Sequence, residues 1–115
     1  MSTKKSELEL LPNETIVKES KGDCWYAPGM FSSKQIPGKY IFTNQRIIFQ
    51  GSGLIAAMRL NFELYYKDIL EMKPCIIGLF IPTGIKIEAK ESKKYKFSIM
   101  KRNSIMELMQ SFLNE

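Results

Sequence analysis

The stretch Gly38-Lys39-Tyr40-Ile41-Phe42-Thr43-Asn44-Gln45-Arg46-Ile47-Ile48-Phe49-Gln50 decides the fold of this chain. Two apolar runs rich in Tyr, Ile and Phe, which suit a pleated and packed surface, flank a four-residue polar connector. Within this connector, Thr43 and Asn44 can hydrogen-bond to their own backbone and stabilise a reversal of the chain. The stretch therefore predicts a tight β-hairpin at the centre of a β-barrel.

The length and composition predict one globular domain. The 115 residues are enough for a single core and too few for two, and 44% of them are hydrophobic. The first ten residues are polar and charged, and no apolar run approaches the roughly 18 residues of a membrane span. We therefore expect a cytoplasmic protein.

Several kinds of chemistry lack their usual residues. The chain has no histidine, its acidic residues form no DxD cluster, and it holds no phosphate-loop, dinucleotide or serine-hydrolase motif. Cys24 and Cys75 lie far apart without CxxC spacing, so we expect two small buried side chains. The sequence therefore predicts no catalytic residue, no metal site, no cofactor and no small-molecule substrate.

Further strands are predicted on both sides of the hairpin. Residues 13–27 begin with a β-like alternation whose inward face is ambiguous, and residues 30–36, between two Pro-Gly pairs, read as a loop or a short edge strand. Residues 58–66 alternate, with Met58, Leu60, Phe62 and Leu64 on one face. The pattern breaks at Lys67-Asp68 and resumes over residues 69–77.

The clearest alternating pair is formed by residues 84–89 and 94–99. Both apolar sets can face the core only if the loop between them has an odd number of residues. A loop of three would place Glu88 opposite Lys94, and a loop of five would place it opposite Lys96; in either case the other face is rich in lysine. The apolar connector 78–84 is expected either to be tucked under the barrel or to be exposed at a tip.

Helical spacing is confined to the two ends of the chain. Residues 103–114 predict one amphipathic helix, with Asn103 or Ser104 as its cap. Residues 4–11 can form one or two helical turns that stop at Pro12.

This order of elements resembles the pleckstrin-homology-like (PH-like) fold, a mainly β barrel of about seven antiparallel strands capped by one C-terminal amphipathic α-helix. Residues 38–49 resemble the G-x-[LI]-[YF]-[LV]-T-N-x-R-[LI]-x-F signature of GRAM and related bacterial PH-like domains. Residues 11–16, with Asn13 where Gly is usual, and residues 66–69 resemble further pieces of these domains in the same order. The last hairpin also fits this order.

The resemblance covers roughly residues 11–113. It implies one GRAM-like domain over residues 11–115, preceded by an N-terminal flap or short helix over residues 1–10. Such domains are non-catalytic modules that bind membrane lipids, often phosphoinositides, or other proteins. We therefore expect no enzyme activity, and fold alone does not decide between these partners.

Positive charge is concentrated near the C-terminus. Residues 86–102 hold seven Lys or Arg against two Glu, which equals the net charge of +5 of the whole chain. Our candidate site combines the lysines of the last hairpin with an apolar tip that could insert shallowly into an anionic lipid surface. Several lysines at roughly 1 kcal/mol each would give weak, salt-sensitive binding and a location peripheral to the membrane. The candidate lysines are Lys86, Lys90, Lys93, Lys94 and Lys96, and the candidate tip is Leu79, Phe80 and Ile81.

The PH-like resemblance implies further anion-binding candidates. Phosphoinositide-binding PH domains carry basic residues at the end of the first strand and in a basic-x-basic pattern on the second. Lys18 and Lys21 match the first region, whereas Lys39-Tyr40-Ile41 supplies only one of the two basic positions on the second. Lys34, in the loop between them, could compensate.

Structural roles compete with these assignments. The lysine hairpin could be merely solvated and the apolar connector buried. Thr43 and Asn44 are expected to hold the turn, while Arg46 pairs with a carboxylate or a carbonyl. Trp25 could form an interfacial anchor together with Tyr26 and Phe31, but packing of Trp25 in the core is the favoured interpretation.

Two other function classes remain open on sequence. One is a protein-interaction or self-assembly module that uses the open barrel edge or residues 76–81 as its contact surface. Its partner would be another protein or a second copy of this chain. The other is single-strand nucleic-acid binding, which needs aromatic side chains among the lysines. Tyr95 and Phe97 alternate with Lys94 and Lys96 and so face the other way, which makes nucleic acid an unfavoured partner.

Overall fold

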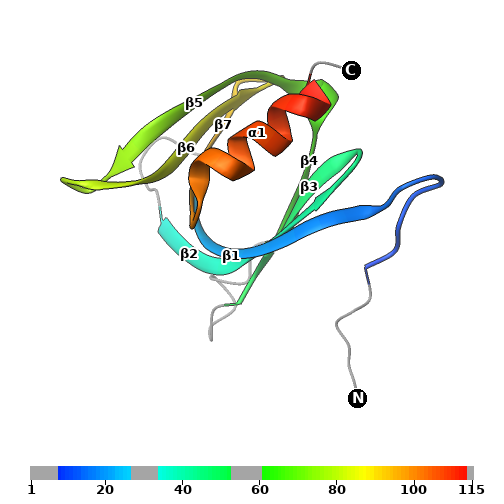
Figure 1. The fold of residues 1–115 in the computed structure, drawn as a ribbon, viewed down its shortest axis with the longest axis horizontal. Coiled ribbons are helices and arrows are strands. Elements are labelled where there is room, and N and C mark those ends of the chain that lie inside the picture. The colour runs from blue at the N-terminus through cyan, green and yellow to red at the C-terminus, as the bar shows by residue number, and fades with distance from the viewer. Residues whose placement is uncertain (1–7, 27–33, 53–60, 114–115) are drawn as a thin grey trace.

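The computed structural model describes residues 8–26, 34–52 and 61–113, with only the backbone of Tyr26 and Lys34. These ranges form seven strands, a short 3-10 helix and one α-helix (Figure 1). The strand order β4-β3-β2-β1-β7-β6-β5 is antiparallel throughout, and the predicted fold class is confirmed. The elements are β1 (Ile16–Tyr26), β2 (Lys34–Thr43), β3 (Arg46–Gly51), β4 (Asn61–Tyr65), η2 (Tyr66–Asp68), β5 (Ile69–Ile77), β6 (Ile81–Ala89), β7 (Lys93–Ile99) and α1 (Arg102–Leu113).

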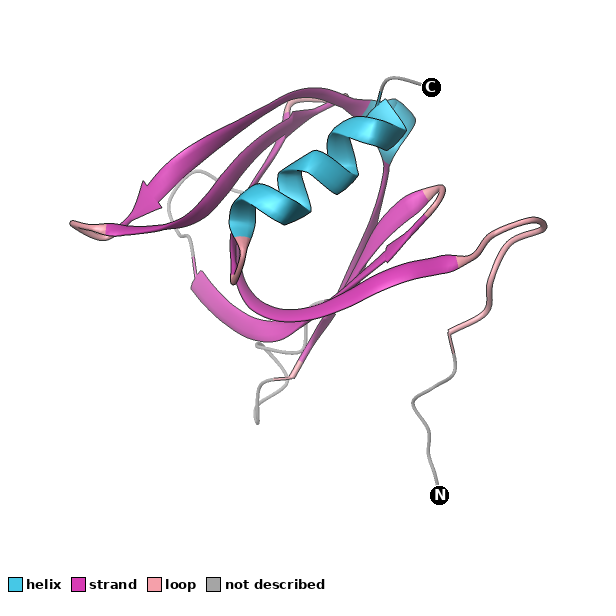
Figure 2. Ribbon diagram, in the orientation of Figure 1, coloured by secondary structure: helices cyan, strands magenta, loops and turns pink. Residues whose placement is uncertain are grey.

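The sheet bends around the core, and α1 lies across its opening (Figure 2). Strands β4 and β5 stand at the two ends of the strand order and are joined through η2, so the chain itself closes one corner. Gly22 of β1 pairs with Gly38 of β2. A Cβ atom at Gly38 would lie 2.4 Å from the Gln50 carbonyl oxygen, which shows that this close approach requires glycine.

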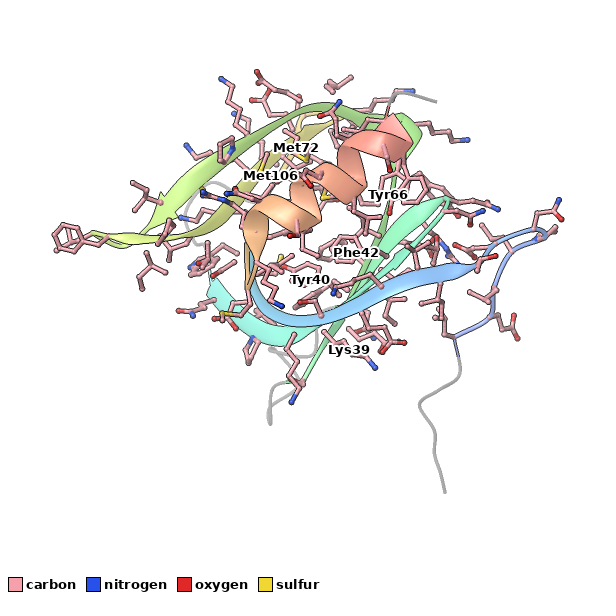
Figure 3. All side chains as sticks on the ribbon, in the orientation of Figure 1. Lys39, Tyr40, Phe42, Tyr66, Met72 and Met106 are labelled. Atoms are coloured by element: carbon pink, nitrogen blue, oxygen red, sulfur yellow. The ribbon has the colours of Figure 1, made fainter. Side chains whose placement is uncertain are left out.

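The core follows from the alternation of the strands. Tyr40 and Phe42 point from β2 into the interior, where Met72 of β5 and Met106 of α1 also lie, whereas Lys39 points outward (Figure 3). The ring centroids of Tyr40 and Phe97 are 4.5 Å apart, which joins the two halves of the sheet. Among the described residues, the largest that are less than 2% exposed are Tyr40, Phe42, Phe49, Phe97, Ile47, Ile85, Ile87, Ile99, Ile105, Met109, Thr43 and Cys24.

The register of the last hairpin is the one that a three-residue loop predicts. Residues 90–92 form the turn between β6 and β7, and Glu88 pairs with Lys94. The Lys94 Nζ lies 3.8 Å from the Glu88 Oε2. The alternative loop of five residues is therefore wrong.

Strand boundaries differ from the sequence prediction in two places. Strand β6 begins at Ile81 rather than at residue 84, so the apolar connector shrinks to an exposed turn over residues 78–80. Of the segment 30–36, the described residues, 34–36, are the first residues of β2 and pair with β1. Residues 30–33, Met58 and Leu60 lie outside the described residues.

The helical predictions hold for the C-terminus and not for the N-terminus. Helix α1 begins one residue earlier than predicted, at Arg102, so Asn103 and Ser104 lie in its first turn instead of capping it. Residues 8–11 are not helical, and residues 1–7 lie outside the described part of the chain. Cys24 is buried as predicted, whereas Cys75 is only half-buried.

Candidate functional site

The sheet register brings three lysines together on the outer face. Lys73 of β5 lies directly opposite Lys86 of β6, and Lys86 lies directly opposite Lys96 of β7. Directly opposed residues have Cβ atoms roughly 4.5–5.5 Å apart, where like charges repel. We refer to Lys73, Lys86 and Lys96 as the lysine row. Lys73 was not among the predicted lysines. Lys86 and Lys96 follow it by 13 and 23 positions, and no local sequence pattern links residues so far apart.

Trp25 extends the lysine row onto β1. It pairs with Lys96, and the Lys96 Nζ lies 5.1 Å from the centroid of the indole. Its neighbour Cys24 faces the core opposite Phe97, so the alternation of β1 turns Trp25 outward. The expectation that Trp25 packs in the core is therefore wrong: the side chain is half-buried on the lysine face.

A hollow of about 360 Å³ lies beside Trp25 on this face. We refer to it as the Trp25 hollow, and it is lined by Trp25, Lys86, Ile87, Glu88, Lys94, Tyr95 and Lys96. Ile87 and Tyr95 are buried and face the core, so their side chains do not present chemistry to the hollow. Glu88 and Lys94 pair with each other, and no described carboxylate forms an ion pair with Lys86 or Lys96.

The remaining lysines of the last hairpin are separated from the row. Lys90 follows β6 and lies 3.6 Å from the Asp68 Oδ1, measured from its Nζ. Lys93 lies on the same side of β7 as the inward-facing residues. It lines a second hollow, at the rim of the barrel, that Glu63 and Glu91 also line. The predicted set of five lysines is thus split: Lys86, Lys94 and Lys96 share the outer face, whereas Lys90 and Lys93 lie among acidic groups at the rim.

The apolar tip is exposed at the end of the β5–β6 hairpin, which projects from the body of the molecule (Figure 1). The side chains of Leu79 and Phe80 are each 82% exposed, and Ile81 is 54% exposed. The alternative of a buried connector is therefore wrong. At about 3.3 Å per residue, the tip lies roughly 30 Å from Lys90, at the other end of β6.

The projecting hairpin is fixed to the start of α1. The guanidinium of Arg102 donates from Nη1 to the carbonyl oxygens of Cys75, at 3.0 Å, and Gly84, at 3.4 Å. These two residues pair with each other across β5 and β6. Arg102 therefore holds β5 and β6, which carry Lys73, Lys86 and the tip.

The lysines implied by the PH-like resemblance do not join this group. Lys21 lies on the outer face of β1 opposite Lys39, about 13 Å along the strand from Trp25. Lys18 lies opposite Phe42 and is exposed. It is further along β1 from Trp25 than Lys21 is. The side chain of Lys34 lies outside the described residues, and its backbone begins β2.

The polar turn of the β2–β3 hairpin is structural, as its favoured interpretation predicts. Arg46 donates from Nε to the Glu14 Oε2 at 2.8 Å and from Nη1 to the Glu63 Oε1 at 2.8 Å. Asn44 accepts a hydrogen bond from the Thr15 backbone N–H at 2.9 Å. The turn therefore clamps the segment before β1 and leaves none of these groups available to bind an anion.

Among the described residues, no three His, Cys, Asp or Glu side chains come together as they would at a metal site. The described part of the chain also contains no helix that is long and apolar enough to cross a membrane. The outer face of β5, β6 and β7, together with Trp25 of β1, presents positive charge, one indole and a hollow. These groups can bind an anion or an apolar group by non-covalent contacts.

Solved structures with the same architecture exist, although no family model matches the sequence and no curated protein matches it. The C-terminal domain of an unknown protein from Leishmania infantum has a TM-score of 0.70 at 15% identity, over 90% of this chain and 88% of that one. The Vps36 N-terminal PH domain has a TM-score of 0.63 at 15% identity, over 93% and 87%.

A human protein gives a third, more distant likeness. The PH domain of pleckstrin homology domain-containing protein family A member 5 has a TM-score of 0.51 at 10% identity, over 99% of this chain and 87% of that one. At these identities the likenesses establish the PH-like fold and nothing finer. A fold by itself does not decide which function it serves.

Proposed function

We propose that this chain is a GRAM-like PH module that binds weakly and peripherally to anionic membrane surfaces through the outer face of β5, β6 and β7. The lysine row is the observation that carries the proposal. Three like charges set directly opposite one another destabilise an isolated sheet, and an anionic partner offsets that repulsion. The Thr43-Asn44-x-Arg46 turn, which holds the N-terminal segment, supports the finer relation to GRAM domains.

The expected affinity is modest. Each lysine near an anionic lipid surface contributes about 1 kcal/mol, and Lys73 shares its charge with Glu71, whose Oε2 lies 3.3 Å from the Lys73 Nζ. Trp25 beside the row adds an amphipathic ring of the kind that favours the membrane interface. The sum favours weak binding that depends strongly on salt.

The tip and the lysine row can meet the same surface only in one orientation. Along β6, Ile81 at the tip lies five residues, or about 16 Å, from Lys86. Screening at physiological salt acts over about 8 Å, so a hairpin inserted upright would lift Lys86 out of reach of the headgroups. We therefore propose that the hairpin lies flat, with Leu79 and Phe80 dipping in at its end.

Sedimentation with vesicles tests the proposal. The protein should sediment with phosphatidylserine-containing vesicles at low salt, stay in solution with neutral phosphatidylcholine vesicles, and be released as salt is raised. Equal sedimentation with both kinds of vesicle would remove the electrostatic basis of the proposal.

Exposure of the tip also favours a second candidate, a protein-interaction or self-assembly module. Leu79 and Phe80 present large apolar side chains, and β5 is an edge strand of the described sheet, where another strand could add. Pro74 within β5 lacks an N–H and weakens that edge as a template. Size-exclusion chromatography with light scattering separates the two, because a monomer at all concentrations would count against self-assembly.

A further inference from the structure

The Trp25 hollow differs from the rest of the lysine face, because two lysines without a described carboxylate partner line it together with an aromatic ring. Lys86 and Lys96 are directly opposed across β6 and β7. The ring of Trp25 borders Lys96, whose Nζ is 5.1 Å from its centroid. Binding to a flat membrane requires only positive charge distributed over a surface. Here the two lysines and the aromatic ring surround a single hollow.

The two lysines suit one phosphate group. Each ammonium carries three hydrogen-bond donors on a flexible four-carbon stem, and the stems start roughly 5 Å apart at Cβ. A phosphate between them can accept from both Lys86 and Lys96, and it would replace their mutual repulsion with two charge-assisted hydrogen bonds.

The indole gives the site an apolar side. Trp25 is half-buried, so it offers a fixed surface on which a flat or apolar organic group can lie. The hollow measures about 360 Å³, within the range of small-ligand pockets. An organic group attached to the phosphate would therefore be covered on one side.

Glu88 limits the charge that the hollow can accept. Its carboxylate lines the hollow and pairs with Lys94 at 3.8 Å. A second phosphate placed toward β6 would meet this carboxylate and be repelled. The hollow therefore favours one phosphate group over a polyphosphate.

We infer that the Trp25 hollow binds a phosphate ester, with its single phosphate between Lys86 and Lys96 and its organic part on Trp25. This inference rests on the proposed function in that both use one face of the sheet. The phosphate ester can come from a soluble compound or from a lipid headgroup, and the experiment separates these sources.

Trp25 is the only tryptophan of the chain, so its indole N–H gives a single resonance in a ¹H–¹⁵N spectrum. We would titrate the full chain with phenyl phosphate, inorganic phosphate and benzyl alcohol while following this resonance. Phenyl phosphate should shift it saturably and at lower concentration than either of the others. Equal shifts with all three probes, or no saturation, would overturn the inference.

Variants locate the phosphate. Lys86→Gln and Lys96→Gln should each weaken phenyl phosphate binding by about tenfold, the equivalent of one lost charged hydrogen bond. Lys67→Gln removes the same charge from an exposed position of η2 and should leave the binding unchanged. Equal weakening by all three variants would show that only net charge matters and would contradict the site.

Sedimentation with phosphatidic acid vesicles distinguishes a soluble ester from a lipid headgroup. It also separates failure of the phosphate-ester site from failure of the membrane proposal. If phenyl phosphate shifts Trp25 and phosphatidic acid vesicles sediment the protein, both proposals stand. If phenyl phosphate alone binds, the hollow takes a soluble ester and the membrane proposal fails. If vesicles alone bind, the membrane proposal stands and the phosphate-ester site is refuted.

Discussion

Arg46 and Glu14 form a two-pronged ion pair across 32 positions of sequence: Nε and Nη2 of the guanidinium donate to Oε2 and Oε1 of the carboxylate at 2.8 and 3.0 Å. Both side chains are buried. The same carboxylate accepts from the Thr43 hydroxyl at 2.7 Å and from the Leu11 backbone N–H at 2.7 Å. This pair fastens the segment before β1 to the β2–β3 turn.

Removing one partner of this pair should be costly. Arg46→Ala leaves the Glu14 carboxylate buried without its cation, and we expect a loss of about 3–5 kcal/mol in the free energy of unfolding, measured with urea. Glu63→Gln alters the second partner of Arg46, whose side chain is 51% exposed, and should cost less than about 1 kcal/mol. Equal effects of the two substitutions would show that the buried pair is not the source of stability.

The same contacts make stability depend on pH. Burial alone would raise the pKa of Glu14, but the hydrogen bonds from Arg46, Leu11 and Thr43 outweigh it and lower the pKa from 4.5 to about 2. The unfolded chain therefore takes up a proton first, and stability that is present above pH 4.5 is lost as the pH falls toward 2. The loss amounts to about 3 kcal/mol.

Glu14→Gln checks this dependence, because the amide does not titrate. The variant should be less stable than the wild type at pH 7, and the gap between the two should narrow as urea unfolding is repeated at pH 4 and pH 3. A gap that stays constant over this range would contradict the lowered pKa.

Gly38 should not tolerate a side chain. A Cβ atom there would lie 2.4 Å from the Gln50 carbonyl oxygen and 2.6 Å from the Phe49 ring, so Gly38→Ala should cost about 1–3 kcal/mol in thermal or urea unfolding. Gly78 has open space around it and φ of 62°, which Asn also adopts readily. Gly78→Asn should therefore stay within about 1 kcal/mol of the wild type.

The apolar tip should affect binding and not folding. Phe80→Ser alters a side chain that is 82% exposed, so the free energy of unfolding should change by less than about 0.5 kcal/mol. Vesicle binding should fall by about threefold to tenfold as inserted apolar area is lost. Leu70→Ser, at the other end of β5, is the matched control, and an equal loss there would exclude a special role for the tip.

Local chemistry explains why the hairpin and the fold class were predictable. Turn chemistry at Thr43 and Asn44 and the parity of residues 84–89 and 94–99 are short-range properties. The parity left two registers for the last hairpin, and one of them, with Glu88 opposite Lys94, is observed. Arg46 was expected to have a carboxylate or carbonyl partner, but its identity as Glu14 depends on where the chain before β1 returns.

The binding face depended on contacts that sequence spacing does not reveal. Lys73 reaches Lys86 only through the register of β5 and β6, which includes shifts at both ends. Trp25 faces outward because Cys24 faces the core, and the alternation of β1 was ambiguous, with an irregularity between Ile16 and Lys18. The lysines of the last hairpin were close in sequence, yet Lys90 and Lys93 lie at the rim with Asp68 and Glu91.

The most direct test of the account compares two triple variants of equal net charge in phosphatidylserine vesicle binding at low salt. One replaces the lysine row, Lys73, Lys86 and Lys96, with Gln, and the other replaces Lys18, Lys39 and Lys67, which lie elsewhere. The account predicts that the lysine-row variant loses at least about tenfold in affinity while the control keeps nearly all of its affinity. Equal losses in the two variants would contradict the claim that the outer face of β5, β6 and β7 is the binding surface.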